Sequence, residues 1–377
     1  MKQDNLHNLT EFPRQCGFTE TLHPDDSKCP VTPHKPDFIP SQILDEARSG
    51  WFPKGVRACI RCELCSPSPE ASFAECADHL LLAGGYREGF IQRAFGGALD
   101  AIVTLQIKGG TSQNRLGWVT PDIEIADKAD KDAIGLFVGC APYYDALLAD
   151  RIDFHPTGEA HAAVALLNAV GIRPVVLRDE VCCGGDRLHA GSRDDFIALG
   201  SRNRDLFRDR GVKTILTICN DCRFTLGRRY PGRIPGWDFE VTSVTDFLLS
   251  RALAFMPTQK KVVVQSPDRY SDPGRVDSVR KLLAGIADLE TLEFYGHPHT
   301  FGSWNIFGGI SKSIERALLK AAESTGAELL LIESVRPLVR LLEGRCPGSW
   351  EETSIPIVGL YGFLSGRHVI ARDFAGA

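Results

Sequence analysis

Short apolar runs alternate with longer amphipathic segments in the middle of the chain, between residues 132 and 255. The short runs are rich in Val, Ile and Leu, as in buried strands, and the longer segments carry apolar residues at helical spacing. Strands are predicted at 133–139, 173–181 and 212–218, and helices at 157–170 and 194–209. Alternating strands and helices are typical of a parallel sheet covered by helices, so this part is predicted to form an α/β lobe.

The same alternation returns after residue 260. Strands are predicted at 261–266, 289–295 and 327–334, and helices at 275–285 and 311–325. The segments between the helix and the next strand are also similar in the two halves. Residues 166–172 have the sequence LLNAVGI, and residues 282–286 have LLAGI. We infer that the chain contains two pseudo-repeated α/β lobes.

The N-terminal hundred residues lack this alternation. Residues 1–40 are proline-rich and irregular, residues 41–50 predict a short helix closed by Gly50, and residues 78–107 predict apolar helical structure. The predicted fold class is therefore α/β, with a small helical N-terminal domain followed by two pseudo-repeated lobes. The expected boundaries are 1–107 for the helical domain, 108–131 for a turn-rich linker, 132–257 for the first lobe and 258–377 for the second.

Composition and charge narrow the class of protein. Hydrophobic residues make up 43% of the 377 positions, which excludes a mostly disordered chain, and a net charge of −5 argues against nucleic-acid binding. No run approaches about 18 consecutive apolar residues, so no membrane span is predicted. The N-terminal sequence lacks the layout of a signal peptide, so we expect a cytoplasmic protein with reduced thiols. Clusters among its 12 cysteines then indicate metal ligands before disulfides.

The first cysteine group is the run Cys59-Ile-Arg-Cys62-Glu-Leu-Cys65. Three thiolates at this spacing wrap a short loop around one face of an iron–sulfur cluster, and bacterial ferredoxins add a fourth Cys followed by Pro. That fourth position is Pro69 here, so the missing ligand is expected to be Cys29, which precedes a proline. A structural zinc site made by the same four cysteines is the alternative.

Cys29-Pro30 looks like the end of an earlier ferredoxin run. Counting back from it by the same spacing gives Asp25, Leu22 and Thr19, so one ligand set is lost while the other is complete. This arrangement resembles the two-cluster helical ferredoxin domain of heterodisulfide-reductase and succinate-dehydrogenase iron–sulfur subunits, with one cluster missing.

The second cysteine group follows the three predicted strands of the first lobe. It consists of Cys140, the pair Cys182-Cys183 and the C-x2-C motif Cys219 to Cys222. The carboxyl ends of parallel strands meet at one edge of a sheet, so these thiols are expected to converge. Two glycines, Gly184 and Gly185, follow the pair and let the backbone approach an inorganic group closely. A strained Cys182–Cys183 disulfide is the competing interpretation.

Three further cysteines, Cys16, Cys76 and Cys346, have no partner at ligand spacing, and we interpret them as small apolar side chains. His189 follows the cysteine pair. We interpret it as a solvated or capping residue, with a hydrogen bond to a cluster sulfur or proton donation as the alternative.

The segments FVGCAPYYDAL, RDEVCCGGDRLHAG and LTICNDCRFTL resemble the cysteine-rich CCG domain of the heterodisulfide reductase B/D-type family. Relatives in that family include iron–sulfur subunits of glycolate oxidase and of benzoyl-CoA reductase complexes. The resemblance implies two cofactors. A cubane [4Fe–4S] cluster would be held by Cys29, Cys59, Cys62 and Cys65, and a noncubane [4Fe–4S] cluster by Cys140, Cys182, Cys183, Cys219 and Cys222, with Cys182 and Cys183 as the catalytic pair.

The second lobe departs from the family. The positions that correspond to its cysteine motifs are occupied by Ser266-Pro267-Asp268, Thr300-Phe301-Gly302 and the segment Ser334 to Pro337. A single Asp and neutral hydroxyls are poor substitutes for soft thiolate ligands. The second lobe is therefore expected to fold and pack against the first without holding a metal.

The resemblance implies an oxidoreductase electron-transfer subunit, in which electrons pass from the cubane to the noncubane cluster. No flavin or nicotinamide motif is present, so a flavoprotein or ferredoxin-type redox partner subunit is expected. One alternative is a catalytic reductase that acts directly on a disulfide or thiol substrate. Another is a zinc-stabilised scaffold without redox function.

Overall fold

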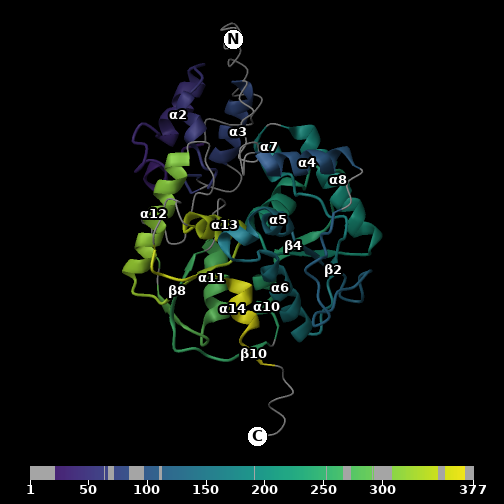
Figure 1. The fold of residues 1–377 in the computed structure, drawn as a ribbon. Helices are drawn as coiled ribbons and strands as arrows, with labels where there is room; N and C mark the ends of the chain where they lie inside the picture. The colour runs from purple at the N-terminus through teal and green to yellow at the C-terminus, as the bar shows by residue number, and fades with distance from the viewer. Residues whose placement is uncertain are drawn as a thin grey trace.

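The computed structural model describes residues 22–62, 64–66, 72–84, 97–109, 113–190, 192–251, 253–265, 273–290, 292, 308–346 and 353–369. Figure 1 shows the N-terminal helices at the top left, a teal α/β lobe on the right and a green-to-yellow α/β lobe at the lower left. No helix in these ranges is both long enough and apolar enough to cross a membrane.

The N-terminal part consists of short helices. They are η3 (Asp26–Lys28), α2 (Pro40–Arg48), η4 (Lys54–Ala58) and α3 (Phe73–Ala83). The predicted helix over 41–50 is confirmed as α2. It starts with Pro40, whose missing N–H is harmless in a first turn, and Gly50 follows its end at a φ of +83°.

Helix α4 (Ala98–Lys108) packs with the first lobe, where Leu99 and Val103 join the hydrophobic core. The apolar segment predicted over 78–107 thus contains two helices, α3 and α4, that lie in different cores. The residues between them, 85–96, lie outside the described ranges.

The first lobe is a four-stranded parallel sheet with helices around it. Its strands are β1 (Ile134–Phe137), β2 (Val175–Val176), β3 (Thr214–Thr217) and β4 (Glu240–Ser243), in the order β2-β1-β3-β4. Its helices are α5 (Ala141–Ile152), α6 (Thr157–Ala169), α7 (Gly185–His189), α8 (Arg193–Asp209), α9 (Asn220–Phe224), the π-helix η7 (Thr225–Arg229) and α10 (Val244–Leu249). Strand β2 is much shorter than the predicted run 173–181, because the chain leaves the sheet after Val176.

The second lobe has a parallel sheet with the same strand order, β7-β6-β8-β9. The strands are β6 (Lys261–Gln265), β7 (Asp288–Glu290), β8 (Leu329–Ile332) and β9 (Ile357–Gly359). The helices are α11 (Pro273–Leu283), α12 (Gly308–Ser324), α13 (Val335–Gly344) and α14 (Leu360–Ser365), and β5 (Ala254–Phe255) pairs with β10 (His368–Val369) in a separate antiparallel ribbon.

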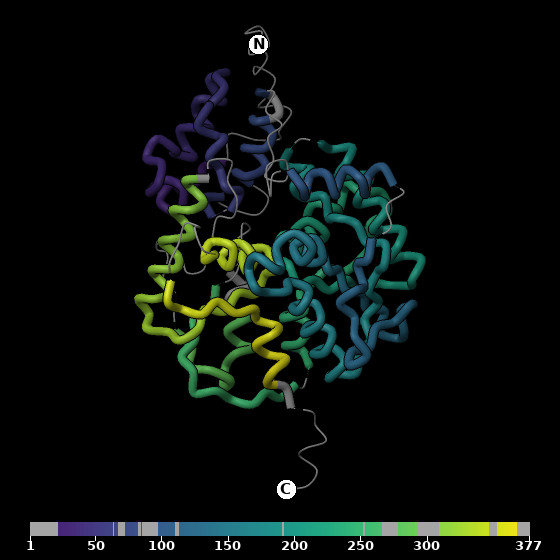
Figure 2. Tube along the Cα trace, in the orientation of Figure 1, coloured from purple at the N-terminus to yellow at the C-terminus, as the bar shows by residue number. Residues whose placement is uncertain are grey.

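The sheet of the second lobe is shared by two hydrophobic cores. Val262 and Val264 of β6 belong to the core that contains the first lobe, whereas Val263 between them belongs to the core of the N-terminal part. This is the alternation that a strand imposes on its side chains. Helix α12 lies on the N-terminal side, next to the purple segment in Figure 2. The second lobe therefore packs against both cysteine-bearing parts of the chain.

Candidate functional site

The second cysteine group comes together at one edge of the first sheet. Cys140 directly precedes α5, Cys219 directly precedes α9, and Cys182 and Cys183 lie on the loop between β2 and α7. Neighbouring thiols are within hydrogen-bonding reach in one continuous series, in the order Cys140, Cys182, Cys183, Cys222, Cys219. The structure thus brings together all five residues that the sequence singled out.

Every cysteine in the described part of the chain is a free thiol, so the alternative of a Cys182–Cys183 disulfide is not formed in the structure. The hydrogen bond with Cys140 and burial raise the pKa of Cys182, and the hydrogen bond with Cys182 and burial raise that of Cys183. The hydrogen bond from Cys222 lowers the pKa of Cys219. Because most of these thiols hold their protons tightly, binding of a metal group must release protons.

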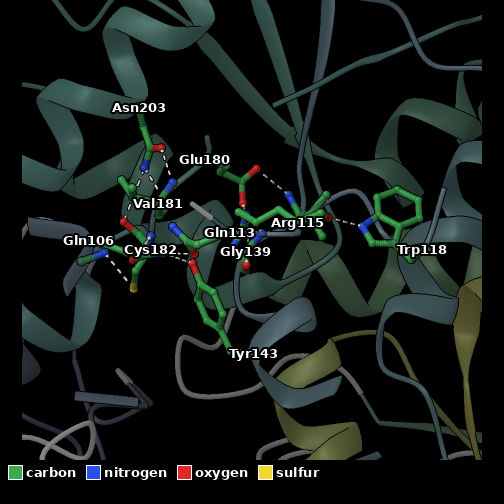
Figure 3. A network of polar contacts seen from close by, with 12 residues as sticks. Gln106, Gln113, Arg115, Trp118, Gly139, Tyr143, Glu180, Val181, Cys182 and Asn203 are labelled. Carbon is green, nitrogen blue, oxygen red and sulfur yellow. Dashed lines mark hydrogen bonds and ion pairs between the residues drawn. The ribbon is translucent and has the colours of Figure 1, made fainter. Parts of the chain in front are cut away.

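Buried polar side chains fix the backbone of the cysteine pair (Figure 3). The Oδ1 atom of Asn203 accepts the N–H of Val181 at 3.0 Å, and its Nδ2 donates to the carbonyl of the same residue at 3.0 Å. Gln106 of α4 accepts the N–H of Cys182 at 3.1 Å. The hydroxyl of Tyr230 donates to the carbonyl of Cys183 at 2.8 Å. These contacts fix the loop that follows the end of β2 and carries Cys182 and Cys183.

A buried ion pair holds the loop that leads to Cys140. Glu180 accepts the N–H groups of Val138 and Gly139 at 3.0 and 2.8 Å, and the Nη2 atom of Arg115 lies 2.5 Å from its carboxylate. Burial raises the pKa of Glu180 to about 6. This pair was not predicted from the sequence, although the position of Glu180 two residues before the cysteine pair was a usable signal.

Glycines leave room beside the thiols. A Cβ on Gly139 would lie 3.0 Å from the sulfur of Cys222, and Gly139 has a φ of +68° that disfavours other residues. Gly184, with a φ of +73°, donates its N–H to the sulfur of Cys182 at 3.4 Å. Five soft donors with close backbone approach fit the chemistry of an iron–sulfur group.

The first cysteine group lines a cavity in the N-terminal part. Cys29, Cys59, Cys62 and Cys65 all face it, together with apolar side chains of Val31, Phe38, Ile60, Phe73 and Ala74. Burial raises the pKa of Cys59 to about 12. Four thiols in an apolar lining also fit an iron–sulfur group. The thiols would supply the ligands, and the apolar side chains would keep water away from the group.

The loop of this group has an unusual backbone. Arg61 adopts a φ of +60°, a left-handed conformation in a residue other than glycine, and its N–H donates to the sulfur of Cys59 at 3.4 Å. Two of the positions that were expected to have lost a ligand cysteine are described. Asp25 caps η3 and donates its N–H to the carbonyl of Cys65 at 2.9 Å, and Leu22 is buried. The other two, Thr19 and Pro69, lie outside the described ranges.

Neither group has the geometry of a site for one metal ion. Among the residues that the structure describes, no set of three or more His, Cys, Asp or Glu side chains meets that geometry. Two of the three remaining cysteines lie in the described part of the chain. Cys76 is fully buried, Cys346 donates to the carbonyl of Arg151 at 3.1 Å, and Cys16 lies outside the described ranges.

Helix α3 connects the two cysteine groups. Its Asp78 accepts the Nε–H of Arg61 at 2.9 Å and also pairs with the Nδ1 atom of His189 in α7. Its Glu75 pairs with Arg229 of η7. The interpretation of His189 as a solvated residue is wrong, because its side chain is only 8% exposed and is held by a carboxylate from the N-terminal part.

The replaced positions of the second lobe are described only in part. Ser266 to Asp268 and Thr300 to Gly302 lie outside the described ranges. Ser334 and Pro337 flank the start of α13, and the Oγ atom of Ser334 accepts the N–H of Asn220, between Cys219 and Cys222, at 3.1 Å. The second lobe therefore contacts the five-cysteine site directly through Ser334.

Comparison with known proteins agrees with the cysteine pattern. The family model of the CCG cysteine-rich domain matches residues 134–227, which contain all five cysteines of the second group. The chain is 28% identical over 340 residues to one of the subunits of the dihydromethanophenazine:CoB–CoM heterodisulfide reductase of Methanosarcina acetivorans. That alignment covers 82% of this chain and 76% of the relative.

Two other relatives are matched over smaller parts of their length. One of the subunits of the fumarate reductase (CoM/CoB) of Methanothermobacter marburgensis is 26% identical over 325 residues, which cover 81% of this chain and 61% of that protein. An uncharacterized iron–sulfur protein of Methanocaldococcus jannaschii is 26% identical over 168 residues, which cover 44% of this chain and 32% of that protein. The chain thus spans less than two thirds of the length of both.

Proposed function

We propose that this chain relays electrons between two iron–sulfur sites. The premise is that the chain belongs to the heterodisulfide reductase B/D-type iron–sulfur family and is an oxidoreductase subunit. The entry site is a cubane [4Fe–4S] cluster at Cys29, Cys59, Cys62 and Cys65. The exit site is a noncubane [4Fe–4S] cluster at Cys140, Cys182, Cys183, Cys219 and Cys222.

The observation that carries the proposal is the presence of two separate thiol sets in one chain. Four thiols surround an apolar cavity, and five thiols form a continuous series at the edge of a sheet. The bound clusters supply one-electron redox chemistry. The chain supplies the ligands, excludes water with the apolar lining, and fixes both cysteine loops through Arg61, Gln106 and Asn203.

The sheet order supports the finer description of the fold. Both lobes have the order second-first-third-fourth with parallel strands, which favours two copies of one ancestral unit. The helices before residue 84 carry the first cysteine group, which favours a ferredoxin-like domain with one retained cluster site. The partner expected for electron supply is a flavoprotein or ferredoxin-type subunit, since relatives are subunits of larger reductases.

The test is anaerobic purification followed by iron, zinc and acid-labile sulfide analysis and electron paramagnetic resonance. Cys29→Ser is expected to remove only the cubane signal, and Cys182→Ser only the noncubane signal, because the two sets share no ligand. Cys346→Ser is the matched control, with both signals unchanged. A colourless protein that contains zinc would instead establish the zinc-stabilised scaffold and contradict the proposal.

A second candidate function is direct reduction of a disulfide substrate at the five-cysteine site. It is favoured by the partial exposure of Cys140 and Cys219 at the two ends of the series, where a substrate sulfur can approach. Relatives named as heterodisulfide reductase subunits also favour it. The experiment that separates the two functions offers disulfides to the dithionite-reduced protein without partners. Reoxidation by a disulfide supports the second function, and its absence supports the relay.

A further inference from the structure

The second lobe places a cation beside the five-cysteine site. Arg336 belongs to α13, which starts with the replaced motif, and its Nη2 atom lies 2.5 Å from the carboxylate of Asp186. Its Nη1 atom lies 2.7 Å from the carboxylate of Asp221. One guanidinium from the second lobe thus joins two carboxylates of the first.

Both carboxylates lie in short helices next to the cysteines. Asp221 lies between Cys219 and Cys222, and Asp186 lies three residues after Cys183 in α7. The side chains of Arg336, Asp186 and Asp221 are only 7%, 5% and 5% exposed. In such a buried setting charges interact strongly, because little water screens them. The guanidinium neutralises one of the two negative charges, so the three groups together carry a charge of about −1 at neutral pH.

The cation also lies close to two ligand positions, because Asp221, which it contacts at 2.7 Å, stands between Cys219 and Cys222 in the chain. A cation that stabilises negative charge on a ligand sulfur also stabilises the added electron of a reduced cluster bound there. Loss of the cation would leave two buried carboxylates beside the site, which disfavours reduction.

We propose that Arg336 is a positioning residue that raises the reduction potential of the five-cysteine site, supplied by a lobe that has lost its own thiol ligands. This inference rests on the proposed function, because it concerns a cluster at Cys140, Cys182, Cys183, Cys219 and Cys222. In this arrangement the second lobe contributes electrostatics to the electron exit site.

The experiment is a redox titration of both clusters, followed by electron paramagnetic resonance, in full-length protein. Arg336→Met is expected to shift the noncubane potential to a more negative value, and Arg336→Lys is expected to restore part of the shift. Arg336→Met/Asp186→Asn removes one charge of each sign and is expected to bring the potential back toward that of the wild type. The cubane potential is the internal reference and is expected to stay constant in every variant.

Arg340→Met is the matched control. Arg340 lies one turn further along α13 and pairs with the buried Glu315, so its loss weakens the same helix without touching the cysteine site. The noncubane potential of Arg340→Met is expected to equal that of the wild type. A purely structural role of Arg336 predicts that both arginine variants lower the thermal midpoint while neither changes the potential.

The outcomes separate this inference from the proposed function. An unchanged noncubane potential in Arg336→Met, with iron and sulfide intact, overturns the inference and leaves the relay standing. Wild-type protein without a cluster at the five-cysteine site overturns both. If Arg336→Met does not fold, the noncubane potential of Asp186→Asn is measured instead. Removal of one negative charge must shift that potential to a more positive value. No such shift would overturn the inference.

Discussion

Glu159 of the first lobe accepts the backbone N–H of Tyr361 of the second lobe at 3.0 Å. The same carboxylate accepts the N–H of Gly362 at 3.2 Å, and burial raises its pKa to about 7. Helices α6 and α14 therefore meet around a buried acid. The protonated acid fits this interface better than the carboxylate does, despite the two N–H donors.

The first prediction follows from this raised pKa. An acid whose pKa is higher in the folded than in the unfolded protein stabilises the fold fully below its unfolded value. The stabilisation is lost as pH rises toward the folded value. For Glu159 the window runs from 4.5 to about 7, and the loss is on the order of 3 kcal/mol. Urea unfolding across this window should show a smaller loss of stability in Glu159→Gln than in wild type, whereas the exposed control Glu124→Gln should follow wild type. Parallel curves for Glu159→Gln and wild type would contradict the prediction.

The second prediction concerns the glycine that faces this acid. A Cβ on Gly359 would lie 2.1 Å from the carboxyl carbon of Glu159, so Gly359→Ala must push the carboxylate away from its N–H donors. We expect a loss of about 1–3 kcal/mol, as for other overpacked interiors. Gly158→Ala is the control, because a Cβ there meets nothing within 4 Å. Chemical unfolding of the two variants provides the measurement, and equal stability of both would show that the interface yields easily.

The third prediction concerns the contact between the two cysteine-bearing parts. Asp78 joins Arg61 of the first cysteine loop to His189 of α7, and its side chain is 11% exposed. Asp78→Asn removes one partner of a buried ion pair, which destabilises proteins by about 3–5 kcal/mol. The exposed Asp45→Asn is the control.

A double-mutant cycle with His189→Gln measures the link between the two parts directly. Residues in contact show coupling energies of about 0.5–3 kcal/mol. We expect a value in this range for Asp78 and His189 from thermal or urea unfolding. A coupling energy of zero would mean that the two parts are held together by other contacts.

The sequence predicted the features that depend on local pattern. Strand β6 and helices α6 and α8 follow from apolar periodicity, and the meeting of Cys140 with Cys182 and Cys219 follows from their position after parallel strands. The ligand roles of these cysteines remain predictions.

Contacts between distant segments were not predictable in this way. Asp78 and His189 are 111 positions apart, and Arg336 and Asp186 are 150 apart. The spacing of apolar residues does not predict such contacts, because they form only when helices that are distant in the sequence pack together. The end of β2 is a different case, because the sequence shows a signal for it. The apolar residues 175–177 are followed by Arg178, Asp179 and Glu180, and the strand ends at Val176.

The last prediction is that the second lobe is necessary although its described motif offers no thiol. Val262 and Val264 of β6 bury one face of its sheet in the core of the first lobe, and Val263 buries the other face against the N-terminal part. Truncation near Met256 would expose these partner surfaces and remove Arg336 from the cysteine site. We expect aggregation or loss of the noncubane signal, measured by size-exclusion chromatography and electron paramagnetic resonance. Co-expression of residues 257–377 as a separate chain should restore both readouts, because side chains of both lobes form one hydrophobic core. A soluble truncated protein with both clusters and full electron transfer would show that the second lobe is dispensable.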